Sequence, residues 1–169
     1  MPKPAFQVQP LGPHHDRAGC SCGVEPLDNY LKKQARQDVK KRVAAVFVLT
    51  PDGRTIGGYY TLSQFSVDLG MLPQEIARRL PRYPSVPATL IGRLAVSTAF
   101  RGQGLGELLL MDALRRSLTL SQQIASAAVI VDAKDDRAIS FYREYGFLEL
   151  PDIPGRFFLP MATVEQLFQ

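Results

Sequence analysis

The sequence of 169 residues has no apolar run as long as the roughly 18 residues that a membrane-spanning helix needs. It also lacks, near its N-terminus, the continuous apolar segment of a signal peptide. Only two cysteines occur, Cys20 and Cys22, and a C-x-C pair without a second pair does not make a zinc site. We therefore expect a cytoplasmic protein with reduced cysteines, no bound metal and no membrane partner.

No internal repeat and no linker divides the chain, so the sequence predicts a single domain over residues 1–169. The hydrophobic fraction of 46% and the charged fraction of 21% are ordinary for a globular protein with one core. The net charge of +4 is modest but unevenly distributed. One basic cluster contains Lys32, Lys33, Arg36, Lys40, Lys41 and Arg42 beside the single acid Asp38, and another contains Arg78, Arg79 and Arg82. Two interpretations stay open: solvated helix faces, or a surface for an anionic partner such as a nucleic acid.

Hydrophobic periodicity and turn residues predict an alternation of strands and helices. The predicted strands cover residues 6–9, 43–50, 55–67, 89–96, 127–131, 147–150 and 157–159. The predicted helices cover residues 25–37, 72–80, 105–118 and 135–145. In the longest helix, the residues expected to face the core are Leu105, Leu108, Leu109, Ala113 and Leu114. This order predicts a mixed α/β or α+β sheet with helices on both faces.

The most informative segment joins the strand that ends at Val96 to the helix that begins at Leu105. It reads R-G-Q-G-L-G over residues 101–106. Glycines allow positive φ and close approach of a ligand to the backbone, and a helix N-terminus supplies free N–H groups and a positive dipole end. The segment therefore predicts a site for a ligand that carries phosphate groups.

A second motif, D-D-R-A-I-S-F-Y-R-E-Y-G-F over residues 135–147, follows an apolar strand. The two motifs in this order closely resemble the GNAT superfamily of N-acetyltransferases. That resemblance covers nearly the whole chain and implies a mostly antiparallel mixed sheet of six to seven strands flanked by about four helices. It also implies acetyl-CoA as the co-substrate.

A narrower resemblance is carried by residues 22–31, 57–63 and 92–96. These segments are similar to the GNAT toxins of toxin–antitoxin pairs, which acetylate the α-amine of aminoacyl-tRNA and so block translation. This implies a tRNA substrate, a small ribbon-helix-helix-type antitoxin and a homodimer. Two alternatives stay open: a GNAT enzyme for a small-molecule amine or a protein N-terminus, and a module that binds acyl-CoA without transfer.

The resemblance also implies roles for individual residues. Tyr142 is expected to act as the general acid toward the departing CoA thiolate. The residues expected to bind the cofactor are Leu94, Ala95, Val96, Arg101, Gly102, Gln103, Gly104, Leu105, Gly106 and Ser140. Arg93 and both basic clusters are the candidates for binding substrate RNA, which requires neutralisation of phosphates.

The predicted strand over residues 89–96 contains no carboxylate, although many family members place a glutamate there as a general base. A lysine amine, with a pKa of about 10.4, would need such a base at neutral pH, whereas an α-amine near about 7.7 is already partly neutral. The missing carboxylate therefore favours an acceptor amine of low pKa, as in aminoacyl-tRNA. Asp132 is the alternative candidate for a base supplied from elsewhere.

Overall fold

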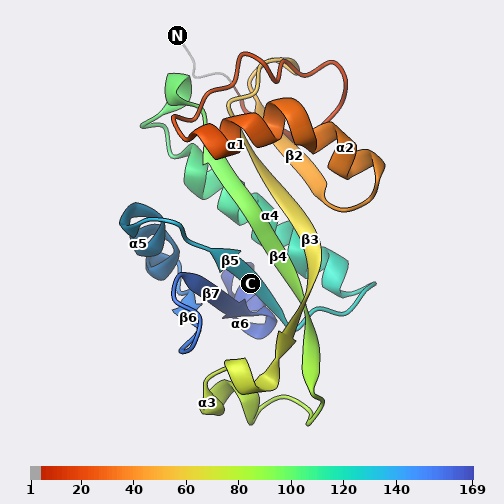
Figure 1. Ribbon diagram of the computed structural model, residues 1–169, viewed down its shortest axis with the longest axis vertical. Helices are drawn as coiled ribbons and strands as arrows, with labels where there is room; N and C mark the ends of the chain where they lie inside the picture. Colours follow the sequence, from red (N-terminus) through yellow and green to blue (C-terminus); the bar gives the residue numbers. More distant parts are fainter. Residues whose placement is uncertain (1–4) are drawn as a thin grey trace. The chain divides into compact units, whose positions relative to one another are not determined.

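A computed structural model describes residues 5–169 and contains one seven-stranded sheet with the strand order β1-β2-β3-β4-β5-β7-β6 (Figure 1). The strands are β1 (Gln7–Pro10), β2 (Ala45–Thr50), β3 (Gly58–Asp68), β4 (Ser85–Val96), β5 (Ala128–Asp132), β6 (Leu148–Glu149) and β7 (Arg156–Pro160). The helices are α1 (Glu25–Asn29), α2 (Ala35–Lys40), α3 (Gln74–Ala77), α4 (Leu105–Ser121), α5 (Asp136–Glu144) and α6 (Met161–Leu167). Among the described residues, no helix has both the length and the apolar composition to cross a membrane.

The chain forms two compact units, each with its own internal contacts. Unit 1 contains the described residues up to Ser63 together with Gly92–Ala113. Unit 2 contains Gln64–Ile91 and Leu114–Gln169. Each unit is made of two stretches that are separated in sequence. The long elements β3, β4 and α4 each contribute residues to both units.

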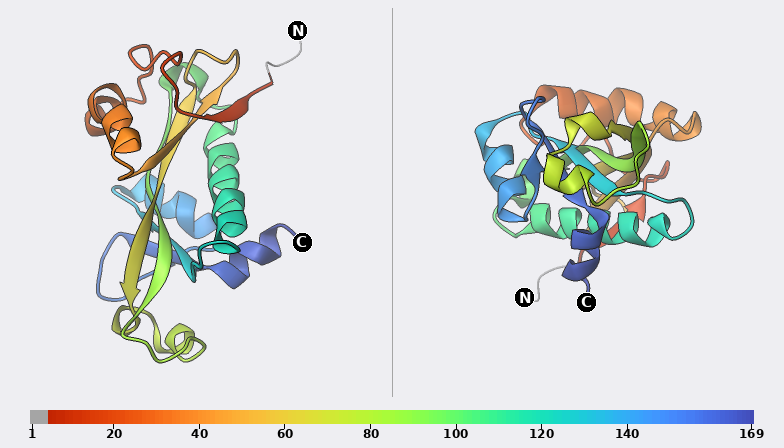
Figure 2. Two further views of the ribbon diagram at one scale, coloured as in Figure 1. Left: turned by 90° about the vertical axis from the view of Figure 1, so that its right-hand side faces the viewer. Right: turned by 90° about the horizontal axis from the view of Figure 1, so that it is seen from below.

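In unit 1, helices cover both faces of the hairpin that β2 and β3 form (Figure 2). One face is covered by the helical segment from α1 to α2, whose Leu31 and Ala35 are fully buried against Val48 and Tyr59. The other face is covered by the first half of α4. Gly58 permits this close packing, because a Cβ there would lie 2.9 Å from Cδ1 of Leu109 on α4 and 2.7 Å from the carbonyl oxygen of Ala95 on β4.

The first helical segment runs to Lys40, three residues beyond its predicted end, and contains a π-helical turn at Tyr30–Gln34 between α1 and α2. The N–H of Ala35 donates to the carbonyl oxygen of Tyr30, a bond that skips one more residue than an α-helical bond. The turn changes the phase of the side chains, and both Tyr30 and Leu31 are buried. Arg42 then ends the segment at a positive φ of 60°.

In unit 2, β4 and β5 pair in parallel from Thr89 to Ile91, and β7 pairs antiparallel with both β5 and β6. The apolar β5 has its residues Ala128–Val131 buried, as its composition predicts. The predicted cap of α5 is confirmed, because the Asp135 carboxylate accepts the N–H of Ala138 at 2.8 Å. Gly146, at φ +90°, follows the end of that helix.

Several further details of the sequence-based prediction were wrong. β4 begins at Ser85 rather than at residue 89, because Pro87 is exposed and its carbonyl oxygen still accepts the N–H of Ala127. Helix α3 is shorter than predicted, and α6 was not predicted at all. Leu108 is 39% exposed, and Leu110 takes its expected place in the core. The fold class is confirmed, with seven strands and, over residues 5–169, five helical segments when the continuous α1–α2 segment is counted once, rather than about four.

Candidate acetyl-CoA site and acceptor surface

The glycine loop after β4 presents an open backbone. Gly102 and Gly104 have φ of +80° and +73°, and a Cβ on either residue would meet nothing within 4 Å. Within residues 5–169, no backbone hydrogen bond uses the N–H of Gly102, Gln103 or Gly104. The first turn of α4 adds N–H groups that have no acceptor within the helix. These donors and the open space beside them fit a pyrophosphate.

The residues before the loop are tied to the segment that precedes α1. The N–H of Thr98 donates to the carbonyl oxygen of Ser21 at 2.8 Å. One guanidinium nitrogen of Arg101 donates to the carbonyl oxygen of Cys22 at 2.9 Å. Leu105, only 4% exposed, anchors the start of α4 in the core. The loop is thus held at both ends while its glycines remain exposed.

The two cysteines of that preceding segment are buried and free, in agreement with the expected reduced state. Burial raises the pKa of the Cys20 thiol to about 11, so the thiol is protonated at neutral pH. Among residues 5–169, no group of three or more His, Cys, Asp or Glu side chains is arranged to hold a metal ion.

The last residues of β4 lie between the parallel pairing and the glycine loop. That pairing with β5 ends at Ile91, and β4 continues through Gly92–Val96. Ala95 is buried, whereas Leu94 and Val96 are half-buried. Their backbone groups are of the kind that an extended amide-containing ligand can bind, as another strand would.

Arg93 is the site residue whose surroundings are best defined. Its guanidinium carbon lies 3.5 Å from the centre of the Tyr30 ring, which is a close cation–π contact. The Tyr30 hydroxyl donates to the Asp38 carboxylate at 2.8 Å, and the Gln34 amide donates to the other oxygen of that carboxylate at 2.8 Å. Burial, followed by the hydrogen bond to Asp38, raises the pKa of Tyr30 to about 12. Arg93 is therefore fixed by a buried ring that is itself fixed by an acid.

The basic residues named as candidates for RNA binding are all exposed except Arg93, which is half-buried. In unit 1, one group of these residues lies on the helical segment from α1 to α2 and on the two residues that follow it: Lys32, Lys33, Arg36, Lys40, Lys41 and Arg42. In unit 2, Arg78 and Arg79 lie at the end of α3.

In unit 2, Tyr142 is buried in α5 with only 6% of its surface exposed. Its ring makes edge contacts with Phe141 and Phe147, at centroid distances of 5.3 and 5.4 Å. Burial, and then the negative charge of Asp132, raise the pKa of the Tyr142 phenol well above its usual value. The hydroxyl therefore keeps its proton at neutral pH. Ser140, in the same helix, is exposed.

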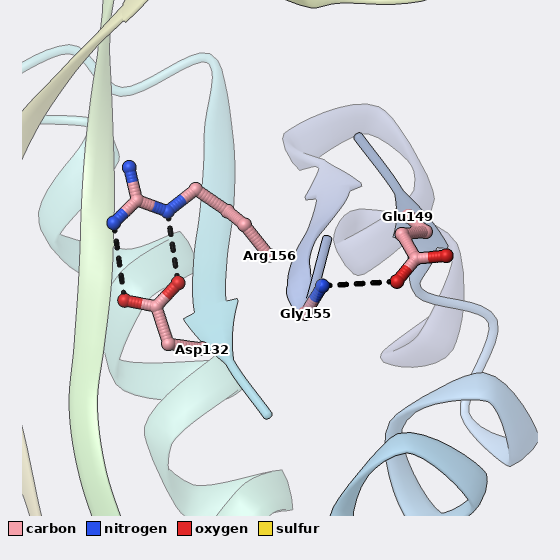
Figure 3. A network of polar contacts seen from close by, with 4 residues as sticks. All are labelled: Asp132, Glu149, Gly155 and Arg156. Carbon is pink, nitrogen blue, oxygen red and sulfur yellow. Dashed lines mark hydrogen bonds and ion pairs between the residues drawn. The ribbon is translucent and has the colours of Figure 1, made fainter. Parts of the chain in front are cut away.

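Asp132, the alternative candidate for a general base, is engaged by Arg156. The Nε and one terminal nitrogen of Arg156 donate to its two carboxylate oxygens at 2.8 and 3.2 Å (Figure 3). Nearby, Glu149 accepts the N–H of Gly155 at 3.0 Å. Both carboxylate oxygens of Asp132 therefore accept from Arg156, and this forked ion pair fixes the carboxylate in place instead of leaving it free to contact an acceptor amine.

Two residues of this site were missed by sequence reasoning. Tyr30 was assigned only to the apolar face of the first helix, and Asp38 was noted only as the single acid in a basic segment. That isolated acid was the available signal, because a lone carboxylate among cations usually has a specific partner. Its partner is a tyrosine that in turn stacks on Arg93.

Residues 42–149 match the family model described as an acetyltransferase (GNAT) domain. The chain is 37% identical over 169 residues to a protein of Sinorhizobium fredii named "Probable toxin TacT", covering 95% of this chain and 93% of that one. It is 34% identical over 152 residues to the "tRNA-acetylating toxin" of Mycobacterium tuberculosis, covering 90% of each chain.

Solved structures agree over almost the entire length. A crystal structure of a KacT mutant has a TM-score of 0.90 at 28% identity, covering 96% of this chain and 99% of that one. AtaT complexed with acetyl-methionyl-tRNAfMet has a TM-score of 0.89 at 26% identity, covering 98% and 100%. AtaTR bound with AcCoA has a TM-score of 0.84 at 25% identity, covering 97% and 98%. With its glycine loop, its strand order and these matches, the chain belongs to the GNAT acetyltransferase family.

Proposed function

We propose that this protein is an acetyl-CoA-dependent N-acetyltransferase, a toxin that acetylates the α-amine of aminoacyl-tRNA and thereby blocks translation. The observation that carries the proposal is the 34% identity, over nine tenths of both chains, to a protein named as a tRNA-acetylating toxin. The solved relatives include one complexed with an acetylated aminoacyl-tRNA and one bound with AcCoA.

The glycine loop is proposed to bind the pyrophosphate of acetyl-CoA. Its unpaired N–H groups at residues 102–104 and the start of α4 supply donors and positive potential. One guanidinium nitrogen of Arg101 donates to the carbonyl oxygen of Cys22, which holds this side chain in place. Arg101 is therefore proposed to add positive charge beside the loop. The pantetheine arm is proposed to pair with the backbone of Leu94–Val96, and Ser140 to donate to the cofactor.

Tyr142 is proposed as the general acid. When the acceptor amine attacks the thioester carbonyl carbon, the C–S bond breaks and its electron pair moves to sulfur. The phenol donates a hydrogen bond or its proton to that sulfur, the amine loses its own proton to solvent, and a phenolate formed in this step regains a proton from solvent. The buried hydroxyl of Tyr142 carries its proton at neutral pH and is therefore available as a donor to the sulfur.

The acceptor is proposed to be an amine of low pKa carried by RNA. β4 presents no carboxylate between Thr89 and Val96, and Asp132 is engaged by Arg156, so neither is suited to deprotonate a lysine-type amine. An aminoacyl amine needs little deprotonation. Arg93 and the exposed cations of the α1–α2 segment supply positive charge for phosphates.

The direct test is to incubate the purified protein with labelled acetyl-CoA and a charged tRNA pool, digest the RNA and identify the acetylated aminoacyl-adenosine by mass spectrometry. We expect label on the α-amine with the wild type and very little with Tyr142→Phe. Label on small amines or protein N-termini alone would replace the proposal with the alternative acceptor class. Binding of acetyl-CoA with no transfer to any of these pools would reject transfer chemistry.

The remaining partners are proposals of the same kind. A toxin of this class requires an antitoxin, and we propose a small ribbon-helix-helix-type protein encoded beside this gene. We also propose a homodimer, a cytoplasmic location and a single functional domain over residues 1–169. Light scattering of the purified protein, and co-purification with the product of the neighbouring reading frame, test the first two.

A further inference from the structure

We propose that the tip of unit 2, formed by α3 and the loop to β4, is a nucleotide-binding site that takes an unpaired base of an RNA on Tyr83 and its phosphates on neighbouring arginines. The inference rests on the proposed function, because it names an RNA contact beyond the acetyl-transfer chemistry. It is carried by an open depression, an exposed aromatic ring and a group of unpaired cations in one short segment.

The surface at this tip forms an open depression with a volume of about 470 Å³. Its lining residues are Leu69, Gln74, Ala77, Arg78, Arg82, Tyr83 and Pro84. This set combines an apolar floor, one amide, two guanidinium groups and an aromatic ring. Those are the groups that stack on a base, read its polar edge and neutralise a phosphate.

Tyr83 is held in an exposed position by the backbone around it. Its side chain is 65% exposed, which is unusual for a ring of this size. It lies between Pro81 and Pro84, which fix φ on both sides, and its N–H donates to the carbonyl oxygen of Pro81 at 2.9 Å. The carbonyl oxygen of Pro84 accepts the N–H of Leu69 at 3.2 Å, which ties the loop to the end of β3. An exposed ring on a stiff loop loses little entropy when a base stacks on it.

The arginines of α3 and of the loop that follows it have no carboxylate partner in the part of the chain that the structure describes. Arg78, Arg79 and Arg82 are exposed, and none of them makes an ion pair within residues 5–169. Below them, Leu72 is buried and Ile76 and Leu80 pack against the core of unit 2, so the tip is anchored. Arg78 and Arg82 line the same depression as the exposed Tyr83 ring, and this combination favours an anionic partner with aromatic groups, which is the chemistry of a nucleic acid.

An unpaired RNA strand fits this arrangement better than a duplex does. A base is free to stack on an aromatic side chain only when it is not already stacked in a helix. A duplex would engage the arginines through its phosphates but leave Tyr83 without a role. A charged tRNA has an unpaired 3′ end next to the amine that the enzyme acetylates, so the substrate itself supplies such a strand.

The test uses the full-length protein and a synthetic RNA hairpin with an unpaired 3′ end that carries 2-aminopurine, whose fluorescence falls on stacking. We expect the wild type and Tyr83→Phe to quench the probe, and Tyr83→Ala to bind about tenfold more weakly without quenching. The matched control is Ile124→Ala, because Ile124 is equally exposed, at 66%, and lies in the same unit. Arg78→Gln with Arg82→Gln should lower the slope of log affinity against log salt by about 1.4, and Arg54→Gln should have no such effect.

The outcomes separate this inference from the proposed function. If the wild type acetylates aminoacyl-tRNA but Tyr83→Ala binds and quenches as the wild type does, the inference is overturned and the function stands. If no aminoacyl-tRNA is acetylated but quenching depends on Tyr83, the site binds RNA and the proposed function fails. Equal affinity for a blunt RNA duplex or for duplex DNA, independent of Tyr83, would overturn the stacking site. If Tyr83→Ala binds the RNA as the wild type does but no longer binds the antitoxin, the inference is overturned in favour of a protein-binding surface.

Discussion

The contact between Arg93 and Tyr30 gives the sharpest prediction. The guanidinium carbon lies 3.5 Å from the ring centre, the ring is buried and Arg93 is half-buried, so the contact is worth about 1–2 kcal/mol. The hydrogen bond from the Tyr30 hydroxyl to the Asp38 carboxylate is worth about 1.5–3 kcal/mol. Tyr30→Phe removes only the second interaction, whereas Tyr30→Leu removes both.

The two variants should therefore separate in activity. With acetyl-CoA saturating, we expect Tyr30→Phe to retain most of the kcat/KM for aminoacyl-tRNA, because the ring still holds the guanidinium. Tyr30→Leu should lose about 5- to 30-fold, the equivalent of about 1–2 kcal/mol. Urea unfolding of Tyr30→Leu, Arg93→Met and the double variant should give a coupling free energy of about 1–2 kcal/mol.

Two results would refute this reasoning. A coupling free energy below about 0.3 kcal/mol would mean that the ring does not hold the guanidinium in solution. An equal loss of kcat/KM in Tyr30→Phe and Tyr30→Leu would mean that the hydroxyl, and not the stack on Arg93, positions the acceptor site. Asp38→Asn serves as the control, because it should lower the pKa of Tyr30 from about 12 while leaving the stack in place.

Further predictions concern the acid, the loop and a turn. Tyr142→Phe should lower kcat by about 10²- to 10⁴-fold with an unchanged KM for acetyl-CoA, because the ring packing is kept; an unchanged kcat would exclude the phenol as acid. Gly104→Ala should cost about 1–2 kcal/mol through its φ of +73° and raise the KM for acetyl-CoA. Gly58→Ala should mainly destabilise the fold, because its Cβ would lie 2.7 Å from the carbonyl oxygen of Ala95. Calorimetry should therefore show a lower unfolding temperature for Gly58→Ala, whereas steady-state kinetics should show the higher KM for acetyl-CoA in Gly104→Ala. Hydrogen bonds from the N–H groups of Arg54 and Thr55 lower the pKa of Asp52 to about 2, so its stabilising effect is present above about pH 4 and is lost as the pH falls through 2. Asp52→Asn should weaken that dependence in acid unfolding.

Features set by neighbouring residues were predictable from the sequence. The glycines at 102 and 104 do adopt positive φ, Asp135 does cap α5, and Gly146 does follow its end. Each depends on the backbone preferences of a few adjacent residues, and these preferences are strong for glycine and for capping side chains. The two motifs, and with them the family, follow from such local features.

Features that depend on distant residues were not predictable in this way. The contact of Arg93 with Tyr30 joins β4 to the first helical segment, and the π-helical turn that accompanies it has no local signal in the sequence. The ion pair of Asp132 with Arg156, which weakens the case for Asp132 as a base, joins β5 to β7.

The sequence by itself therefore predicted a phosphate site at residues 101–106 and a candidate acid at Tyr142, and it determined that β4 carries no carboxylate between Thr89 and Val96. Only the tertiary structure decided what holds Arg93, what occupies Asp132 and that the exposed Tyr83 lines an open depression. The physical reason is that backbone conformation follows mainly from adjacent residues, whereas the partner and the burial of a charged or aromatic side chain depend on which distant segments fold against it.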